Sequence, residues 1–255
     1  MLQHLALGQR ARAAGWHLLI SVVVATFAAA LVFGVWYPGA YRLLSGGRDL
    51  FFLVTGVDVV LGPLLTFTVF NMKKGWSHLR RDLAVIGLLQ ATALIYGLHT
   101  VYVVRPVATV LEIDRFRVIT AGDVYLPELP NARPEYRSLP LTGPWVLGVR
   151  AAATADERND ALFKGLGGVD IGQRPIFWQP YPDSMGAAVA KSRPISELLA
   201  HYPARAADFR AGLAEMKADA ATARFLPLMA RGGDWVMVLD ASGALLGPLQ
   251  ADGFF

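Results

Sequence analysis

The chain has 255 residues, a positive mean hydropathy of +0.40 and only 17% charged residues, which excludes an ordinary water-soluble domain. It contains no cysteine, so disulfides, thiol nucleophiles and cysteine-bound metals are excluded as well. Much of the net charge of +4 lies beside apolar runs. Positive charge in that position sets the orientation of membrane helices and contacts lipid headgroups, so we do not expect the protein to bind nucleic acid.

Three apolar runs are each long enough to cross a bilayer as a helix, which takes about 20 residues. They cover residues 16–37, 50–71 and 83–104. The first run follows positive charge, as a signal peptide does, but it is longer than a signal core and ends in the bulky pair Trp36 and Tyr37. We therefore expect three transmembrane α-helices within residues 1–104, with the first one retained.

The positive-inside rule predicts the orientation of these spans. Residues 71–82, between the second and third runs, carry four basic residues, and two more precede the first run; the opposite side carries three. We therefore expect the N-terminus and residues 71–82 in the cytoplasm of a bacterium and residues 105–255 in the periplasm. The basic residues are Arg10, Arg12, Lys73, Lys74, Arg80 and Arg81 on one side and Arg42, Arg48 and Arg105 on the other.

One carboxylate, Asp58, stands near the middle of the second span, five residues before Pro63. A charge at that depth costs at least about 2.5 kcal/mol, so such a residue usually faces other helices or a cavity. The helical rise places Asp58 about as deep as Tyr96 of the third span, and His99 shares a helix face with Tyr96. We therefore expect an intramembrane polar cluster of these residues, in which Asp58 is either functional or structural. His99 is either a proton site or solvated at the interface.

After Arg105 the pattern changes to strand-like alternation, which predicts a small α+β domain over residues 105–255. A proline-rich irregular stretch is expected over residues 126–144. The other expected elements are strands within 107–120 and 145–150, a helix over 156–166 capped by Thr154 or Asp156, two short helices within 194–216 that start after a Ser192 cap and after Pro203, and a meander over 223–251.

The residues do not form a motif typical of an enzyme. The sequence has no G-x-S-x-G nucleophile motif and no phosphate-binding loop, and its five histidines are scattered. We therefore expect no catalytic residue, no cofactor and no metal. Four aromatic residues of the second half form either a core or an exposed patch for a partner: Trp145, Phe177, Trp178 and Tyr181.

Six segments carry a resemblance to a known family: FGVWYPGAY at 33–41, GVDVVLGPLLTFTVFN at 56–71, RRDLAVIGLLQ with ALIYG within 80–97, RPVATVLEIDRF at 105–116, RSLPLTGP at 137–144 and DWVMVLDA at 234–241. In combination they resemble the TfpX/TfpZ-type family of type IV pilin accessory proteins. The resemblance extends over nearly the full length, and none of the segments is a catalytic signature.

The resemblance implies a bacterial inner-membrane protein that is not an enzyme and acts as a pilin-dedicated chaperone or modulator of type IV pilus assembly and dynamics. The implied partner is the major pilin, contacted at its membrane helix and its periplasmic head, in addition to inner-membrane lipids. The alternative is a membrane-bound enzyme that modifies pilin by glycan or phospho-group transfer.

Small residues of the second and third spans suit a groove for the pilin helix, because small side chains let helices approach closely. The four aromatic residues named above are the candidate contacts with the pilin head. The expected groove residues are Gly56, Gly62, Pro63, Gly87, Ala91 and Gly97.

Overall fold

The computed structural model describes residues 2–71 and 75–255, with side chains from residue 7 onward. The predicted cytoplasmic residues Lys73 and Lys74 lie outside the described residues. The chain divides into two compact units. One comprises Met1–Pro38 and Gly47–Val103, and the other comprises Gly39–Gly46 and Val104–Phe255.

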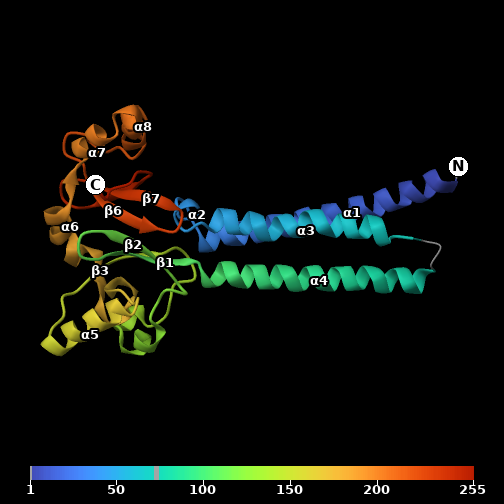
Figure 1. Cartoon of the computed structure of the whole chain (residues 1–255), viewed down its shortest axis with the longest axis horizontal. Helices are drawn as coiled ribbons and strands as arrows, with labels where there is room; N and C mark the ends of the chain where they lie inside the picture. Colours follow the sequence, from blue (N-terminus) through green and yellow to red (C-terminus); the bar gives the residue numbers. More distant parts are fainter. Residues whose placement is uncertain (1, 72–74) are drawn as a thin grey trace. The chain divides into compact units, whose positions relative to one another are not determined.

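The first unit consists of three long helices (Figure 1). Each is long and apolar enough to cross a membrane, as expected from the three apolar runs. The third helix begins seven residues before the predicted start at residue 83, so its first turns carry the basic residues Arg80 and Arg81. The helices are α1 (Leu2–Leu31), continued by the π-helical turn η1 (Val32–Trp36), α3 (Gly47–Val69) and α4 (Trp76–Val103).

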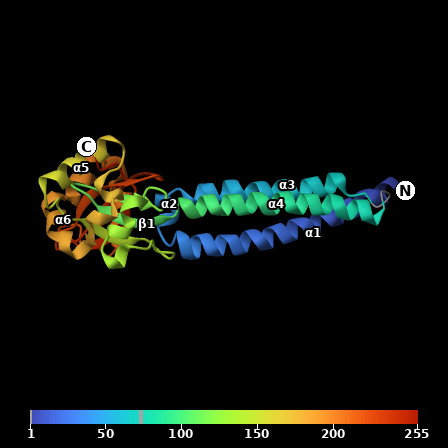
Figure 2. The ribbon, with the colours of Figure 1, turned by 90° about the horizontal axis from the view of Figure 1, so that it is seen from below.

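The three helices run alongside one another (Figure 2). Both α1 and α4 pack along α3 and make few contacts with each other, so α3 is the centre of this unit. At one end the three helices share an apolar cluster. There the buried Tyr37 hydroxyl donates a 2.8 Å hydrogen bond to the main-chain carbonyl of Val101. The cluster consists of Ala28, Val32, Tyr37, Phe51 and Val101.

The second unit is built on a mixed sheet, and its α+β class agrees with the expectation from sequence. The described strands follow the order β4-β3-β1-β2-β6-β7-β8, and β5 pairs with β6. The last three long strands form the expected meander. The strands are β1 (Pro106–Leu111), β2 (Phe116–Thr120), β3 (Trp145–Val149), β4 (Trp178–Pro180), β5 (Arg193–Pro194), β6 (Arg224–Ala230), β7 (Gly233–Leu239) and β8 (Leu245–Leu249).

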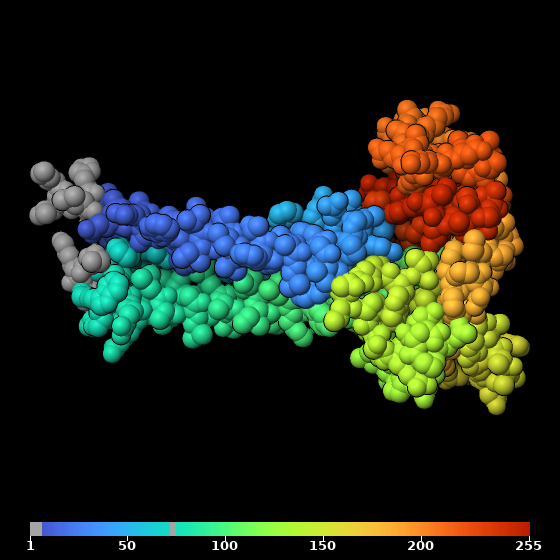
Figure 3. Space-filling view, turned by 180° about the vertical axis from the view of Figure 1, so that it is seen from behind, coloured from blue at the N-terminus to red at the C-terminus, as the bar shows by residue number. Residues whose placement is uncertain are grey.

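Helices and 3-10 turns gather into two lobes on either side of the red C-terminal strands in Figure 3, one coloured orange and the other yellow to green. The helix α5 is capped by Thr154, whose hydroxyl accepts a 3.1 Å hydrogen bond from the main-chain N–H of Glu157. The helices of this unit are α2 (Tyr41–Leu44), α5 (Ala155–Leu166), α6 (Met185–Lys191), α7 (Ile195–His201) and α8 (Ala206–Glu215).

The short helix α2 comes from the loop between α1 and α3, yet it belongs to the second unit. Leu44 is buried in the same core as Phe116 and Trp235, and its carbonyl accepts a 2.7 Å hydrogen bond from the main-chain N–H of Gly232. The Tyr41 hydroxyl lies 2.7 Å from the Thr109 hydroxyl, and burial raises the pKa of Tyr41. The polar residues of this stretch, Arg42, Arg48 and Asp49, and its turn residues, Ser45, Gly46 and Gly47, predict a short polar loop, and this prediction is wrong for Tyr41–Leu44.

The predicted cap of the first short helix in 194–216 was also wrong. The helix α7 begins at Ile195 with Pro194 as its N-cap, whereas Ser192 ends the preceding helix α6, which the sequence reading missed. The Ser192 hydroxyl donates to the carbonyl of Val189 at 2.9 Å and accepts from Arg224 at 2.6 Å. The Ser192 hydroxyl thus bonds to the last turn of α6 and to Arg224 of β6, so it does not cap α7.

Candidate functional site

A cavity of about 200 Å³ lies in the helical unit, where α1 and α4 flank α3. Since α1 and α4 pack mainly on α3, a groove remains between them with α3 as its floor. Five of the lining side chains are polar and come from all three helices: His17 and Ser21 of α1, Thr55 and Asp58 of α3, and Gln90 of α4. The other lining residues are Ile20, Val24, Ala25, Val59, Gly87 and Leu94.

The polar floor of the cavity is held by contacts between the helices. The side-chain amide of Gln90 donates a 3.0 Å hydrogen bond to the main-chain carbonyl of Asp58. This approach depends on Gly62, because a Cβ atom at that position would overlap the Gln90 amide. The adjacent Pro63 has no N–H group, so the helix lacks one of its own hydrogen bonds here.

A second polar contact joins α1 to α3. His17 Nδ1 lies 2.5 Å from the hydroxyl of Thr66, which is buried. The buried Thr55 hydroxyl is turned back to its own helix and donates to the carbonyl of Phe51 at 2.7 Å. These side chains therefore already have partners within the unit.

The carboxylate of Asp58 differs from these groups. It lines the cavity and is partly exposed, and among the residues that the structure describes none donates a hydrogen bond to it. A carboxylate in a mainly apolar environment is costly unless it is paired or hydrogen-bonded. The site can therefore accept a hydrogen-bond donor or a cationic group from another molecule.

Comparison with known proteins places the chain in a family. A sequence profile of the fimbrial assembly protein FimB matches residues 6–46. The fimbrial assembly protein of serogroup E1 from Dichelobacter nodosus is 37% identical over 246 residues, which cover 96% of each chain. The chain belongs to the fimbrial assembly protein family.

Two further members of the fimbrial assembly family from D. nodosus are similar to it. The serogroup I protein is 37% identical over 96% of both chains, and the protein of serogroups C1 and C2 is 44% identical over 122 residues, which cover 48% of this chain and 93% of that one. The resemblance to TfpX/TfpZ-type proteins is compatible with this family. No solved structure matches the chain.

In this family member the three residues of the expected polar cluster do not come together. The Tyr96 side chain is 73% exposed and His99 is exposed, whereas Asp58 faces the cavity with Gln90. The reason is helix rotation: Gln90, Leu94 and Gly97 follow each other at spacings of four and three and share the face toward α3. Depth in the membrane does not determine this rotation. Gln90 was identifiable from sequence as a polar residue within an apolar span.

The expected groove residues serve two different purposes. Gly62 and Gly97 are buried at the contact between α3 and α4, where added Cβ atoms would overlap Gln90 and Val54. Gly56, Gly87 and Ala91 are exposed, and Pro63 is partly buried. Of the six residues only Gly87 lines the cavity. Gly87 thus faces the cavity between α1 and α4, whereas Gly62 and Gly97 are occupied by the contact between α3 and α4.

The expected head-contact aromatic residues are mostly core. Phe177 and Trp178 are fully buried, Tyr181 is 6% exposed, and only Trp145 is partly exposed. The Trp178 indole donates to the carbonyl of Gly172 at 2.8 Å, and the Tyr181 hydroxyl donates to that of Gly243 at 2.6 Å. Burial raises the pKa of Tyr181 to about 12. The first three residues therefore cannot form an exposed patch.

Proposed function

We propose that the chain is a non-enzymatic membrane accessory protein of fimbrial assembly that is dedicated to a type IV pilin. The observation that carries the proposal is the similarity to fimbrial assembly proteins of D. nodosus over 96% of both chains. Three helices that are apolar enough to cross a membrane suit a protein that meets pilin before pilin leaves the inner membrane.

The groove between α1 and α4 is the proposed site for the membrane helix of pilin. A fourth helix laid on α3 would fill it, and the small residue Gly87 lets that helix approach closely. The unpartnered carboxylate of Asp58 favours an occupant with a hydrogen-bond donor or a cation at the same depth. Hydrogen bonds between membrane helices contribute about 1–2 kcal/mol in model peptides, which suits a reversible complex.

The proposed orientation places residues 105–255 in the periplasm, where the pilin head lies. Gly39–Gly46 and Val104–Phe255 fold into one unit, which supports placing both on the same side of the membrane. Basic residues near the starts of α1 and α4 support a cytoplasmic location for those helix ends. They are Arg10, Arg12, Arg80 and Arg81. The second unit would then act on the pilin head as a chaperone or modulator of assembly.

Site-directed crosslinking in the intact membrane tests the helix site. A photoreactive residue at Gly87 of the full-length chain should capture pilin, because Gly87 lines the groove. The control position is Leu89, which is 63% exposed on α4 and does not line the cavity. Replacing Asp58 by Leu in the Gly87 variant should reduce the yield of the pilin crosslink.

Two outcomes would contradict the proposal. Equal capture of pilin at both positions would mean that pilin meets the helices without using the groove. Capture of a lipid-linked sugar or phosphate donor at Gly87, without pilin, would favour the enzyme that modifies pilin by group transfer.

A further inference from the structure

The sheet of the second unit has one face whose two halves are covered by separate clusters. On this face Val110, Ile119 and Trp178 belong to a cluster over β1–β4, whereas Phe225 and Val238 belong to another beneath α7 and α8. The third cluster, which contains Phe116 and Leu228, lies on the opposite face because side chains alternate along a strand. The middle of the first face, over the junction of β2 and β6, is left between the two clusters.

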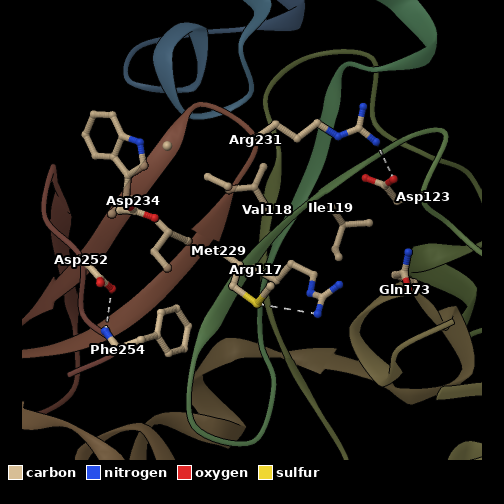
Figure 4. A pocket seen from close by; sticks show the side chains of 14 residues that line it. Arg117, Val118, Ile119, Asp123, Gln173, Met229, Arg231, Asp234, Asp252 and Phe254 are labelled. Carbon is tan, nitrogen blue, oxygen red and sulfur yellow. Dashed lines mark hydrogen bonds and ion pairs between the residues drawn. The ribbon is translucent and has the colours of Figure 1, made fainter. Parts of the chain in front are cut away.

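The two strands at this junction pair only briefly. Their parallel ladder consists of Phe116 with Leu228 and Arg117 with Met229, and it stops there. A cavity of about 360 Å³ opens at this point (Figure 4). Arg117, Ile119 and Met229 form its floor, Asp123 and Gln173 stand on one side, and Asp252 and Phe254 stand on the other.

The two arginines of this cavity have acidic partners. Arg231 forms a 2.8 Å ion pair with Asp123, which links the β6–β7 turn to the segment after β2 (Figure 4). Arg117 Nη2 lies 2.6 Å from Asp170, and its Nε lies 3.1 Å from Glu112 but is not aligned for a hydrogen bond. Burial raises the pKa of Glu112, and Arg117 acts against that shift. The positive charges are therefore largely compensated within the unit.

Two carboxylates of the cavity lack such compensation. Asp234 and Asp252 form no ion pair with any cation in the described part of the chain. Among the described residues, the Asp252 carboxylate accepts a hydrogen bond only from the main-chain N–H of Phe254, at 2.8 Å, and Asp234 is exposed at the start of β7. The cavity thus presents two carboxylates without an ion pair beside a floor that combines the apolar side chains of Ile119 and Met229 with the paired Arg117.

The same two carboxylates also line a neighbouring cavity of about 480 Å³. Its other walls include Tyr202, Arg205 and Gln250, and Arg205 donates to the carbonyl of Gln250 at 2.9 Å. Because the two cavities share Asp234 and Asp252, they adjoin each other, and together we call them the elongated groove. The two carboxylates lie where the cavities meet, and Arg205, which has no acidic partner among the described residues, adds one positive charge to the wall of the second cavity.

We propose that this elongated groove binds an extended segment of a partner polypeptide, with a lysine or arginine side chain of that segment placed between Asp234 and Asp252. An extended chain advances about 3.3 Å per residue and sends alternate side chains to one side, so apolar and cationic residues can enter the two cavities in turn. The proposal goes beyond the membrane-helix site and does not depend on it.

Binding of peptide pools to the full-length protein in nanodiscs tests the proposal. The probes are fluorescent nonapeptide pools with a fixed central lysine, glutamate or norleucine, and fluorescence polarisation gives the affinity. The lysine pool should bind about tenfold more tightly than the glutamate pool, because two unpaired carboxylates attract the cation and repel the anion. The Asp234→Asn/Asp252→Asn variant should lose this preference.

Two controls keep the result interpretable. The Asp208→Asn/Glu215→Gln variant changes the charge equally at exposed positions of α8 outside both cavities, and it should keep the lysine preference. The single variant Asp234→Asn keeps the Asp252 hydrogen bond to Phe254 and should already weaken lysine-pool binding.

Three results would overturn the proposal. These are equal binding of the lysine and glutamate pools, unchanged binding by the Asp234→Asn/Asp252→Asn variant, and displacement of the lysine pool by free acetyl-lysine amide as effectively as by unlabelled peptide. The last result would identify a site for a small cation. If a photoreactive residue at Gly87 captured no pilin, the membrane-helix site would be contradicted but the peptide groove would not. The two proposals can therefore be tested independently.

Discussion

The side chain of Gln90 reaches from α4 to the main-chain carbonyl of Asp58 on α3, at 3.0 Å, and it does so through the space left by Gly62. This contact ties the two helices together one turn before Pro63 interrupts the hydrogen bonds of α3. The glycine, the proline and the amide thus act as one structural element. It holds the floor of the polar cavity in place.

Replacing Gly62 by Ala should destabilise the contact between α3 and α4, because the new methyl group overlaps the Gln90 amide. Overpacking of this kind costs about 1–3 kcal/mol. Replacing Gln90 by Ala alone should cost about 0.6 kcal/mol, a typical value for one hydrogen bond between membrane helices. Thermal unfolding in nanodiscs measures both. The double variant should be less destabilised than the sum, and strict additivity would contradict the predicted overlap.

The substitutions Gly97→Leu and Gly87→Leu should affect different properties, the first the stability of the protein and the second its binding of pilin. A Cβ atom added at Gly97 would overlap the Val54 side chain of α3, whereas a Cβ added at Gly87 has no described atom of another element within 4 Å. Gly97→Leu should therefore lower the thermal stability, and Gly87→Leu should leave it unchanged but reduce co-purification of pilin. Pilin binding that survives Gly87→Leu in a stably folded protein would argue against the groove between α1 and α4.

Replacing Arg174 by Met should strongly destabilise the second unit, which comprises Gly39–Gly46 and Val104–Phe255. The Arg174 side chain is 1% exposed and contacts Glu128 and Asp160, each at 2.6 Å. Its removal leaves the nearly buried Glu128 without its main partner, and breaking a buried pair in this way costs about 3–5 kcal/mol. Chemical denaturation of the full-length protein in detergent measures the loss. A second change, Glu128→Gln, should recover part of it by removing the unpaired charge.

The pair of Arg150 and Glu157 predicts a pH-dependent contribution to stability. Hydrogen bonds from Arg150 and from the main-chain N–H of Ala153 lower the pKa of Glu157 from 4.5 to about 2. Because the pKa is lower in the folded state, the contribution is complete above pH 4.5 and disappears as the pH falls toward 2. Glu157→Gln should therefore cost from a few tenths to about 1 kcal/mol at pH 7 and almost nothing near pH 2.

The control for this measurement is Glu215→Gln, at an exposed position of α8 without an ion pair among the described residues. Its effect on the melting temperature at pH 7 should be small. A Glu157→Gln effect that is constant between pH 7 and pH 2.5 would contradict the prediction.

Much of the fold could be predicted because its signals are local. Long apolar runs identify α1, α3 and α4, the Thr154 cap identifies α5, and the turns at Gly232 and Gly243 identify the final meander. The candidate site could be predicted only in part. Asp58 was identifiable because a carboxylate is rare in a membrane span, but its neighbours depend on how α1 and α4 are rotated about their own axes.

The contacts that sequence could not reveal are those between distant segments. Leu44 enters a core whose other members follow more than sixty positions later, and nothing in the local pattern of residues 39–46 indicates this. The groove over β2 and β6 was also hidden, because it arises from a short strand pairing between residues about 112 positions apart.

The position of α2 in the second unit constrains how the chain can fold during synthesis and membrane insertion. Gly39–Gly46 leave the ribosome before α3 and α4, but their partners Thr109, Trp235 and Gly232 are synthesised after both helices. If α3 or α4 failed to cross the membrane, this segment and the sheet would be stranded on opposite sides and Leu44 could not reach its core. A chain in which only one of these two helices had inserted would therefore leave the core of the second unit without Leu44.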